Sequence, residues 1–136
     1  MAIHVDAFVF SYPHPDQSAG PWLRILTGFN CAVFPVNVDG LRLETRLRID
    51  GESVNEEFET RFELRDPDGK VLLASPAQSH PLLPTQFGAA TAMITVPLSG
   101  VMLEAPGPYE ATLYVNEQPR ADTILPVDRD VPLNRT

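Results

Sequence analysis

The sequence predicts an all-β protein, an antiparallel β-sandwich of about seven to nine strands with an immunoglobulin-like or C2-like topology. Three observations support this fold class. Apolar residues recur at every second position in several segments, which is the period of a strand with one buried face. Proline, which ends strands and breaks helices, occurs 14 times in 136 residues,. No stretch of ten residues repeats its apolar side chains with the 3.6-residue period of a helix.

Two charged segments show the alternation most clearly. LRLETRLRI at 41–49 and EFETRFELR at 57–65 carry mainly apolar residues at alternate positions and arginine or glutamate between them. We expect each to be a strand with one face in the core and one in water. Further strands are predicted at 3–10, 22–29, 70–75, 91–98, 109–116 and 120–127, joined by proline- and glycine-rich loops at 11–21, 75–88 and 98–108,. The predicted core comprises Val5, Val9, Ile25, Leu43, Leu47, Phe58, Phe62, Leu64, Leu73, Ile94, Val96, Tyr109, Leu113 and Val115.

The length predicts one domain, residues 1–127, followed by a polar and flexible tail at 128–136,. A chain of this size buries about 65–70% of its unfolded surface and needs no metal or disulfide to fold. Cys31 is the single cysteine, so no disulfide can form within the chain,. Its apolar neighbours, GFNCAVF, predict a buried structural thiol and not a nucleophile,.

The charge balance restricts the classes of partner. The net charge of −8 disfavours nucleic acid and anionic membrane surfaces, and is explained by solubility,. The N-terminal residues lack the basic and apolar regions of a signal peptide, and no stretch approaches about 20 apolar residues. We therefore expect a cytoplasmic protein with no nucleic acid and no membrane partner.

The charged faces of 41–49 and 57–65 predict a hairpin register. If the two strands pair so that Arg48 lies opposite Glu57, every charged pair along the hairpin is opposite in sign. The remaining pairs in this register are Arg46–Glu59, Glu44–Arg61 and Arg42–Glu63. Each cross-strand pair contributes about 0.2–1 kcal/mol, and a shift of two residues would oppose like charges. The charges are thus interpreted as pairing signals and not as a ligand site.

The sequence DPDG at 66–69 admits two interpretations. Asp66 and Asp68 have the spacing that begins a calcium loop, but a calcium site needs six to eight oxygens and position twelve here is Ala77,. A tight turn accounts for all four residues, since Pro67 presets φ, Asp68 suits the next position and Gly69 accepts positive φ. We favour the turn, although oxygens from a distant loop could still join the two aspartates.

Catalytic patterns are not apparent. His4, His14 and His80 lack the spacing of a local metal motif,. His4 and Asp6 share one face of a strand and could orient a base, but a surface contact is the simpler explanation. His14 and His80 lie in proline-flanked loops, where we expect them to be solvated. The sequence therefore assigns no catalytic, cofactor-binding or metal-binding residue.

The stretch PGPYEATLYV at 106–115 resembles the tyrosine corner of immunoglobulin-like domains, in which a tyrosine hydroxyl anchors the preceding loop,. The resemblance implies a structural role for Tyr109. The whole chain also resembles a family of short, uncharacterised bacterial cytosolic β-sandwich proteins. The segments that carry this resemblance are Leu26 to Phe29, Phe34-Pro35, 41–49, 66–69 and 106–115. It implies no established activity and supplies no catalytic residues.

The sequence is compatible with three functions. The first is a non-enzymatic interaction module that binds a protein partner or self-associates through a sheet face or edge, aided by aromatic loops at Tyr12-Pro13, Trp22 and Phe87,. The second is a calcium- or small-ligand-binding sandwich that uses its end loops. The third is an enzyme whose site combines two or more histidine or acidic side chains from distant loops. We favour the first, with no cofactor, because no catalytic pattern is present.

Overall fold

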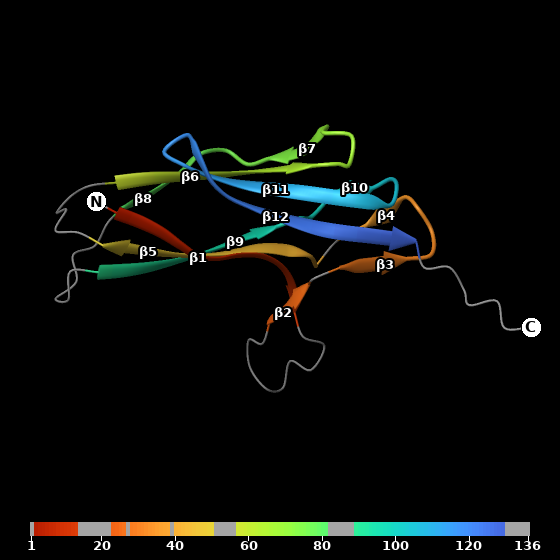
Figure 1. Ribbon diagram of the computed structural model, residues 1–136, viewed down its shortest axis with the longest axis horizontal. Coiled ribbons are helices and arrows are strands. Elements are labelled where there is room, and N and C mark those ends of the chain that lie inside the picture. The colour runs from red at the N-terminus through yellow and green to blue at the C-terminus, as the bar shows by residue number, and fades with distance from the viewer. Residues whose placement is uncertain are drawn as a thin grey trace, which may run out of the picture.

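A computed structural model describes residues 2–13, 23–26, 28–38, 40–50, 57–81 and 89–129. Within these ranges the chain forms twelve strands and no helix, and two main sheets lie one above the other as a sandwich (Figure 1). The predicted all-β sandwich is confirmed. None of the described residues belongs to a helix that is long and apolar enough to cross a membrane.

The first sheet has four antiparallel strands. Its order is β2 (Leu23–Leu26), β1 (Ala2–Pro13), β5 (Arg42–Asp50) and β9 (Ala89–Pro97). The β1–β5 pairing shifts its register between Val5 and Ala7, which marks a bulge in β1. The β5–β9 pairing is regular over nine residue pairs, from Arg42 opposite Pro97 to Asp50 opposite Ala89.

The second sheet is built around β6 and β11. Its order is β3 (Phe29–Cys31), β12 (Gln118–Arg129), β11 (Gly107–Val115), β6 (Glu57–Arg65) and β7 (Val71–Ala74), and β8 (Gln78–Pro81) pairs with the first half of β6. The β3–β12 pair is parallel, an exception to the predicted antiparallel arrangement. A separate two-stranded ribbon joins β4 (Val36–Asn37) to β10 (Met102–Leu103).

Each of the eight predicted strands contains strand structure. The predicted strand 22–29 is divided, because β2 belongs to the first sheet and β3 to the second. The described residues hold more than seven to nine strands, since β8 and β10 are short pieces inside predicted loops and β4 is a two-residue strand between the predicted strands 22–29 and 41–49. β12 continues to Arg129 and takes in the first two residues of the predicted tail, while 130–136 lie outside the described residues.

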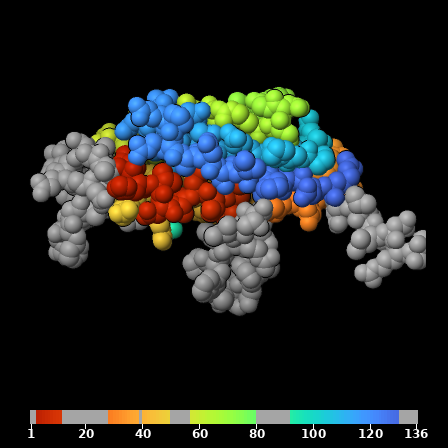
Figure 2. Space-filling view, in the orientation of Figure 1, coloured from red at the N-terminus to blue at the C-terminus, as the bar shows by residue number. Residues whose placement is uncertain are grey.

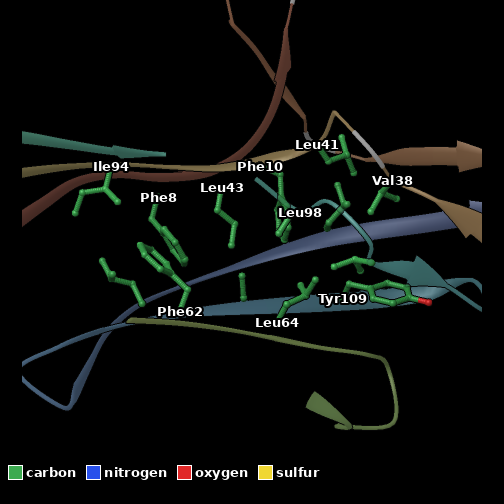
Figure 3. Packing of buried hydrophobic residues seen from close by; sticks show 14 of the residues in the cluster. Phe8, Phe10, Val38, Leu41, Leu43, Phe62, Leu64, Ile94, Leu98 and Tyr109 are labelled. Atoms are coloured by element: carbon green, nitrogen blue, oxygen red, sulfur yellow. The ribbon is translucent and has the colours of Figure 1, made fainter. Parts of the chain in front are cut away.

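The core lies between the two sheets, where inward side chains of both meet (Figure 3). The rings of Phe8 from β1 and Phe62 from β6 stack with centroids 6.0 Å apart, which joins the sheets directly. Nine of the predicted core residues are buried: Leu43, Leu47, Phe58, Phe62, Leu64, Ile94, Tyr109, Leu113 and Val115. Val5, Leu73 and Val96 are partly buried and pack against this cluster, and the side chain of Ile25 lies outside the described residues.

The prediction that Val9 belongs to the core is wrong, and a bulge in β1 is the reason. The bulge after Val5 shifts the alternation of β1 by one residue, so that Phe8 and Phe10 face the core. Val9 is half-buried and does not belong to the core cluster. An extra residue in one strand of a pair reverses the side to which the following residues point, and the sequence alternation alone did not reveal it.

The predicted hairpin between 41–49 and 57–65 is also wrong, because the two strands lie in different sheets. β5 pairs with β1 and β9, whereas β6 pairs with β11, β7 and β8. Both strands bury their apolar faces in one core, but from opposite sides. Consecutive strands are neighbours only about two-thirds of the time, and arginines and glutamates can find opposite charges on several strands. Charge complementarity was therefore insufficient to identify the partner.

Candidate functional site

The DPDG segment forms the turn between β6 and β7, as predicted. The Asp66 carbonyl accepts a hydrogen bond from the Gly69 amide at 2.9 Å, and Gly69 has a φ of 88°. One carboxylate oxygen of Asp66 accepts hydrogen bonds from the amides of Asp68 at 3.0 Å and Lys70 at 2.8 Å. Asp66 thus organises the turn through a side chain that accepts hydrogen bonds from the backbone amides of the following residues,.

The turn packs against the other motif singled out in the sequence, PGPY. Gly107 has a φ of 139°, and a side-chain carbon at this position would lie 2.6 Å from Cγ of Pro67. Two residues later, Tyr109 is buried and donates its hydroxyl hydrogen bond to the Ala105 carbonyl at 2.6 Å. This is the contact expected of a tyrosine corner and confirms the structural role of Tyr109. Figure 3 shows the hydroxyl at the rim of the core.

A pocket of about 220 Å³ lies between these two motifs. Asp66, Asp68, Lys70 and Glu104 supply its charged lining, while Leu72, Met102 and Tyr109 supply apolar surface. The pocket therefore gathers the two or more acidic groups that an enzyme built from distant loops would need. Among the residues that the structure describes, no group of three or more histidine, cysteine, aspartate or glutamate side chains could hold a metal ion.

The other candidate residues are dispersed. His4 and Asp6 are exposed on β1, where Arg48 lies 3.6 Å from Asp6 in an ion pair. His80 is part of β8 and not of a loop, and its side chain lies outside the described part, as do His14, Trp22 and Phe87 and the side chains of Tyr12 and Pro13.

Cys31 is half-buried and not buried as predicted, and its thiol donates to the Val33 carbonyl at 3.0 Å. β3, which carries Cys31, is a three-residue strand, and β12 is its single partner among the described strands. A short strand at the border of a sheet leaves its last residue partly open to solvent, and the apolar neighbours in sequence could not reveal that position.

A polar network covers the outer face of the second sheet. Glu63 of β6 accepts hydrogen bonds from Arg61 at 2.9 Å, from Arg65, and from the Tyr114 hydroxyl at 3.1 Å. The guanidinium of Arg61 also lies 3.8 Å above the Tyr114 ring and 3.0 Å from Glu117. The hydrogen bond from Arg61 is the main reason that the pKa of the Glu63 carboxyl falls below its ordinary value,.

This network explains the charges of Arg61, Glu63 and Arg65 without a ligand. Its members bond to one another along β6 and across to β11, and Thr112 of β11 extends it to Asp122 of β12 at 3.0 Å. The ion pairs of Arg61 and Arg65 with Glu63 run along β6, and the contacts with β11 go to Tyr114 and Thr112, so the predicted pairing of these charges with β5 is wrong.

The open edges of the two sheets differ greatly in length. In the described part of the chain β9 pairs only with β5, so one of its edges has no strand beside it. β9 spans nine residues, whereas the border strands β2, β3, β7 and β8 span three or four. Residues 2–9 of β1 and 118–126 of β12 also pair with a described strand on one edge only, but these two strands lie against each other. Natural sheets usually protect an edge by shortness, charge, proline or a bulge.

β9 has little of this protection. Its sequence, AATAMITVP, contains no charged residue, its pairing with β5 has no bulge, and its one proline is the last residue. Ile94 points into the core, and Met93 points outward with 66% of its surface exposed. On the same outer face, Thr95 donates a hydrogen bond to Glu44 at 2.8 Å, and Arg46 of β5 lies opposite Met93.

Comparison with known families adds one assignment. Residues 23–128 match the Family of unknown function (DUF6941). The chain belongs to this family. The match runs from the first residue of β2 into β12, so it includes β9 and nearly all of the second sheet, whereas β1 of the first sheet lies outside it. No curated protein matches the chain.

Solved structures share the fold of this family member. A β-D-glucoside glucohydrolase from Trichoderma reesei is 11% identical with a TM-score of 0.52, and the similarity covers 93% of this chain but 19% of the enzyme. A β-glucosidase from Listeria innocua is 7% identical with a TM-score of 0.52, covering 93% of this chain and 16% of the enzyme. At these identities the similarity concerns the fold alone.

Replacing Gly107 by alanine should lower the stability of the fold. The new methyl group would meet the Pro67 ring and would require an unfavourable positive φ, so we expect a loss of about 1–3 kcal/mol in the free energy of unfolding. Chemical denaturation measures this loss. Gly100→Ala is the matched control, because its φ is also positive, at 81°, but its added carbon would have no neighbour within 4 Å. Equal losses in both variants would contradict the packing of Pro67 on Gly107.

Glu63 should make the fold sensitive to acid. Because its pKa is lowered on folding, its ionised form stabilises the folded state above the unfolded pKa of about 4.3, and this contribution is lost as the pH falls through the folded value. We expect the decline in stability below about pH 5 to be smaller in Glu63→Gln than in the parent. Denaturation between pH 7 and pH 3 measures it, with Glu59→Gln, an exposed position on the same strand, as the control.

Proposed function

We propose that the protein is a non-enzymatic interaction module that binds a protein strand along the open edge of β9. A strand added at an open edge forms main-chain hydrogen bonds with it, and the side chains on either face determine specificity. The observation that carries this proposal is the regular, charge-free edge of nine residues, which is more than twice as long as the four-residue edges.

Two further observations support β9 as the contact region. Met93 is exposed, and the flexible thioether of methionine adapts to different partners,. By contrast, the charged groups on the outer face of β6 and β11 bond to one another, and a partner there would have to displace these contacts. The edge needs no such rearrangement, because among the described strands β9 pairs with β5 alone and its other edge is left for a partner strand,.

The proposal also includes the cellular location and the partner classes that the family resemblance and the charge imply. We expect a bacterial protein that acts in the cytoplasm and binds neither nucleic acid nor membranes, in keeping with its net charge of −8,. Fractionation of cells that express the tagged chain tests the location.

The proposal can be tested by photo-crosslinking in cells. A photoreactive phenylalanine analogue at position 93 should form a covalent adduct with a protein, identified by mass spectrometry, because the partner strand would lie against this position. The matched control is position 124 of β12, where Ile124 is 53% exposed on the other sheet. Absence of any protein adduct at position 93, or equal adducts at both positions, would contradict β9 as the contact region.

The calcium alternative predicts a different result. Asp66 already uses one carboxylate oxygen in the turn, so we expect calorimetric titration with calcium to give no saturable heat. A saturable heat that disappears in Asp68→Asn would instead favour the second function, a ligand site at the pocket beside the DPDG turn.

A further inference from the structure

We propose that the strand which occupies the β9 edge is β9 of a second copy of the same chain, paired antiparallel about a two-fold axis at Met93. This inference rests on the proposed function and names its partner. The four-stranded first sheet of one copy would join that of the other into one continuous sheet, with the two β9 strands at its centre. A two-fold interface of this kind closes on itself and gives a dimer and not a fibre.

The length of β9 determines the register. Met93 is the middle residue of Ala89–Pro97, so pairing the whole strand with itself places Met93 opposite Met93 of the second copy. The shift to Ile94 as the centre would leave the first two residues of β9 unpaired, and the shift to Ala92 would leave the last two unpaired. Only the register centred on Met93 uses all nine residues, including the proline, which would lie at the end of the ladder where a missing N–H has least effect.

The side chains are complementary in this register. On the inner face, Ala92 of one copy lies opposite Ile94 of the other, so a small residue meets a large one. On the outer face, Met93 meets Met93 at the axis, where both side chains are exposed in the single copy and would become covered together. Position 95 lies opposite position 91.

Charge also favours a second copy over a charged partner. β9 offers a partner strand no charged residue to pair with, and an uncharged strand with alternating apolar residues fits it best. A self-paired strand with an arginine or glutamate at its centre would oppose like charges, and β9 avoids this. The two copies still repel each other as whole molecules, since each carries a net charge of −8. Raising the salt concentration should therefore strengthen the dimer.

The experiment uses the expected position of residue 93 of one copy opposite residue 93 of the other copy. Sedimentation of the intact chain over a range of concentrations should show the mass rising from 15.0 kDa towards twice that value. Met93→Lys alone and Met93→Glu alone each place like charges together at the axis, and each should weaken association by at least about tenfold. A one-to-one mixture of the two variants should restore the dimer, because lysine then meets glutamate. Ile124→Lys and Ile124→Glu are the matched controls and should associate like the parent.

Circular dichroism would reveal whether the charged variants misfold. If they do, a variant with a smaller substitution tests the same pairing. Met93→Cys in a Cys31→Ser background should form a disulfide-linked dimer on oxidation, because paired Cα atoms of adjacent strands lie about 4.5–5.5 Å apart. Thr95→Cys in the same background should not, because position 95 lies opposite position 91.

The outcomes separate this inference from the proposed function. A parent chain that remains at 15.0 kDa, or a charge-swapped mixture that does not associate, overturns the self-pairing. If position 93 then crosslinks to a different protein, the edge still binds a partner and the proposed function stands. If it crosslinks to none, both fail.

Discussion

The two sheets share one apolar interior, and the remaining features of the molecule follow from this constraint. β5 and β6 bring Leu43, Leu47, Phe58 and Phe62 to the same cluster from opposite layers, and the stacked rings of Phe8 and Phe62 join the layers directly. Each large apolar side chain contributes about 1.5–3 kcal/mol when fully buried. Burial therefore outweighs the charged pairs on the outer faces. In Figure 2, β12 lies directly against β1, so this side of the sandwich is closed by the two strands.

Polar interactions act within the limits set by the core. The contacts of Glu63 with Arg61, Arg65 and Tyr114 tie β6 to β11 after burial has made these strands neighbours. At the far end of the same strand pair, the DPDG turn and the tyrosine corner pack together through Pro67 and Gly107. Two segments 40 residues apart in sequence thus stabilise one end of the sandwich, and the pocket between them follows from their shapes.

An open sandwich must end in edges, and the treatment of these edges distinguishes β9. Shortness limits the backbone that β2, β3, β7 and β8 expose, but β9 is long, regular and uncharged. An unprotected edge of this kind promotes unwanted pairing in a protein that must remain alone. Its presence in a chain with a net charge of −8, which otherwise favours solubility, is physically consistent with an edge that is covered by a partner,.

The sequence by itself determined the fold class, the positions of the main strands, the DPDG turn and the role of Tyr109. These features depend on local patterns: period-two alternation, the φ preferences of proline and glycine, and the two-residue spacing of the PGPY motif. The tertiary structure alone decided which strands are neighbours, where the bulge in β1 reverses its faces, and which strand is left with an open edge. These properties depend on the packing of segments far apart in the chain. Local alternation fixes which side of a strand is apolar, but it contains no information about the strand on the other side of the core.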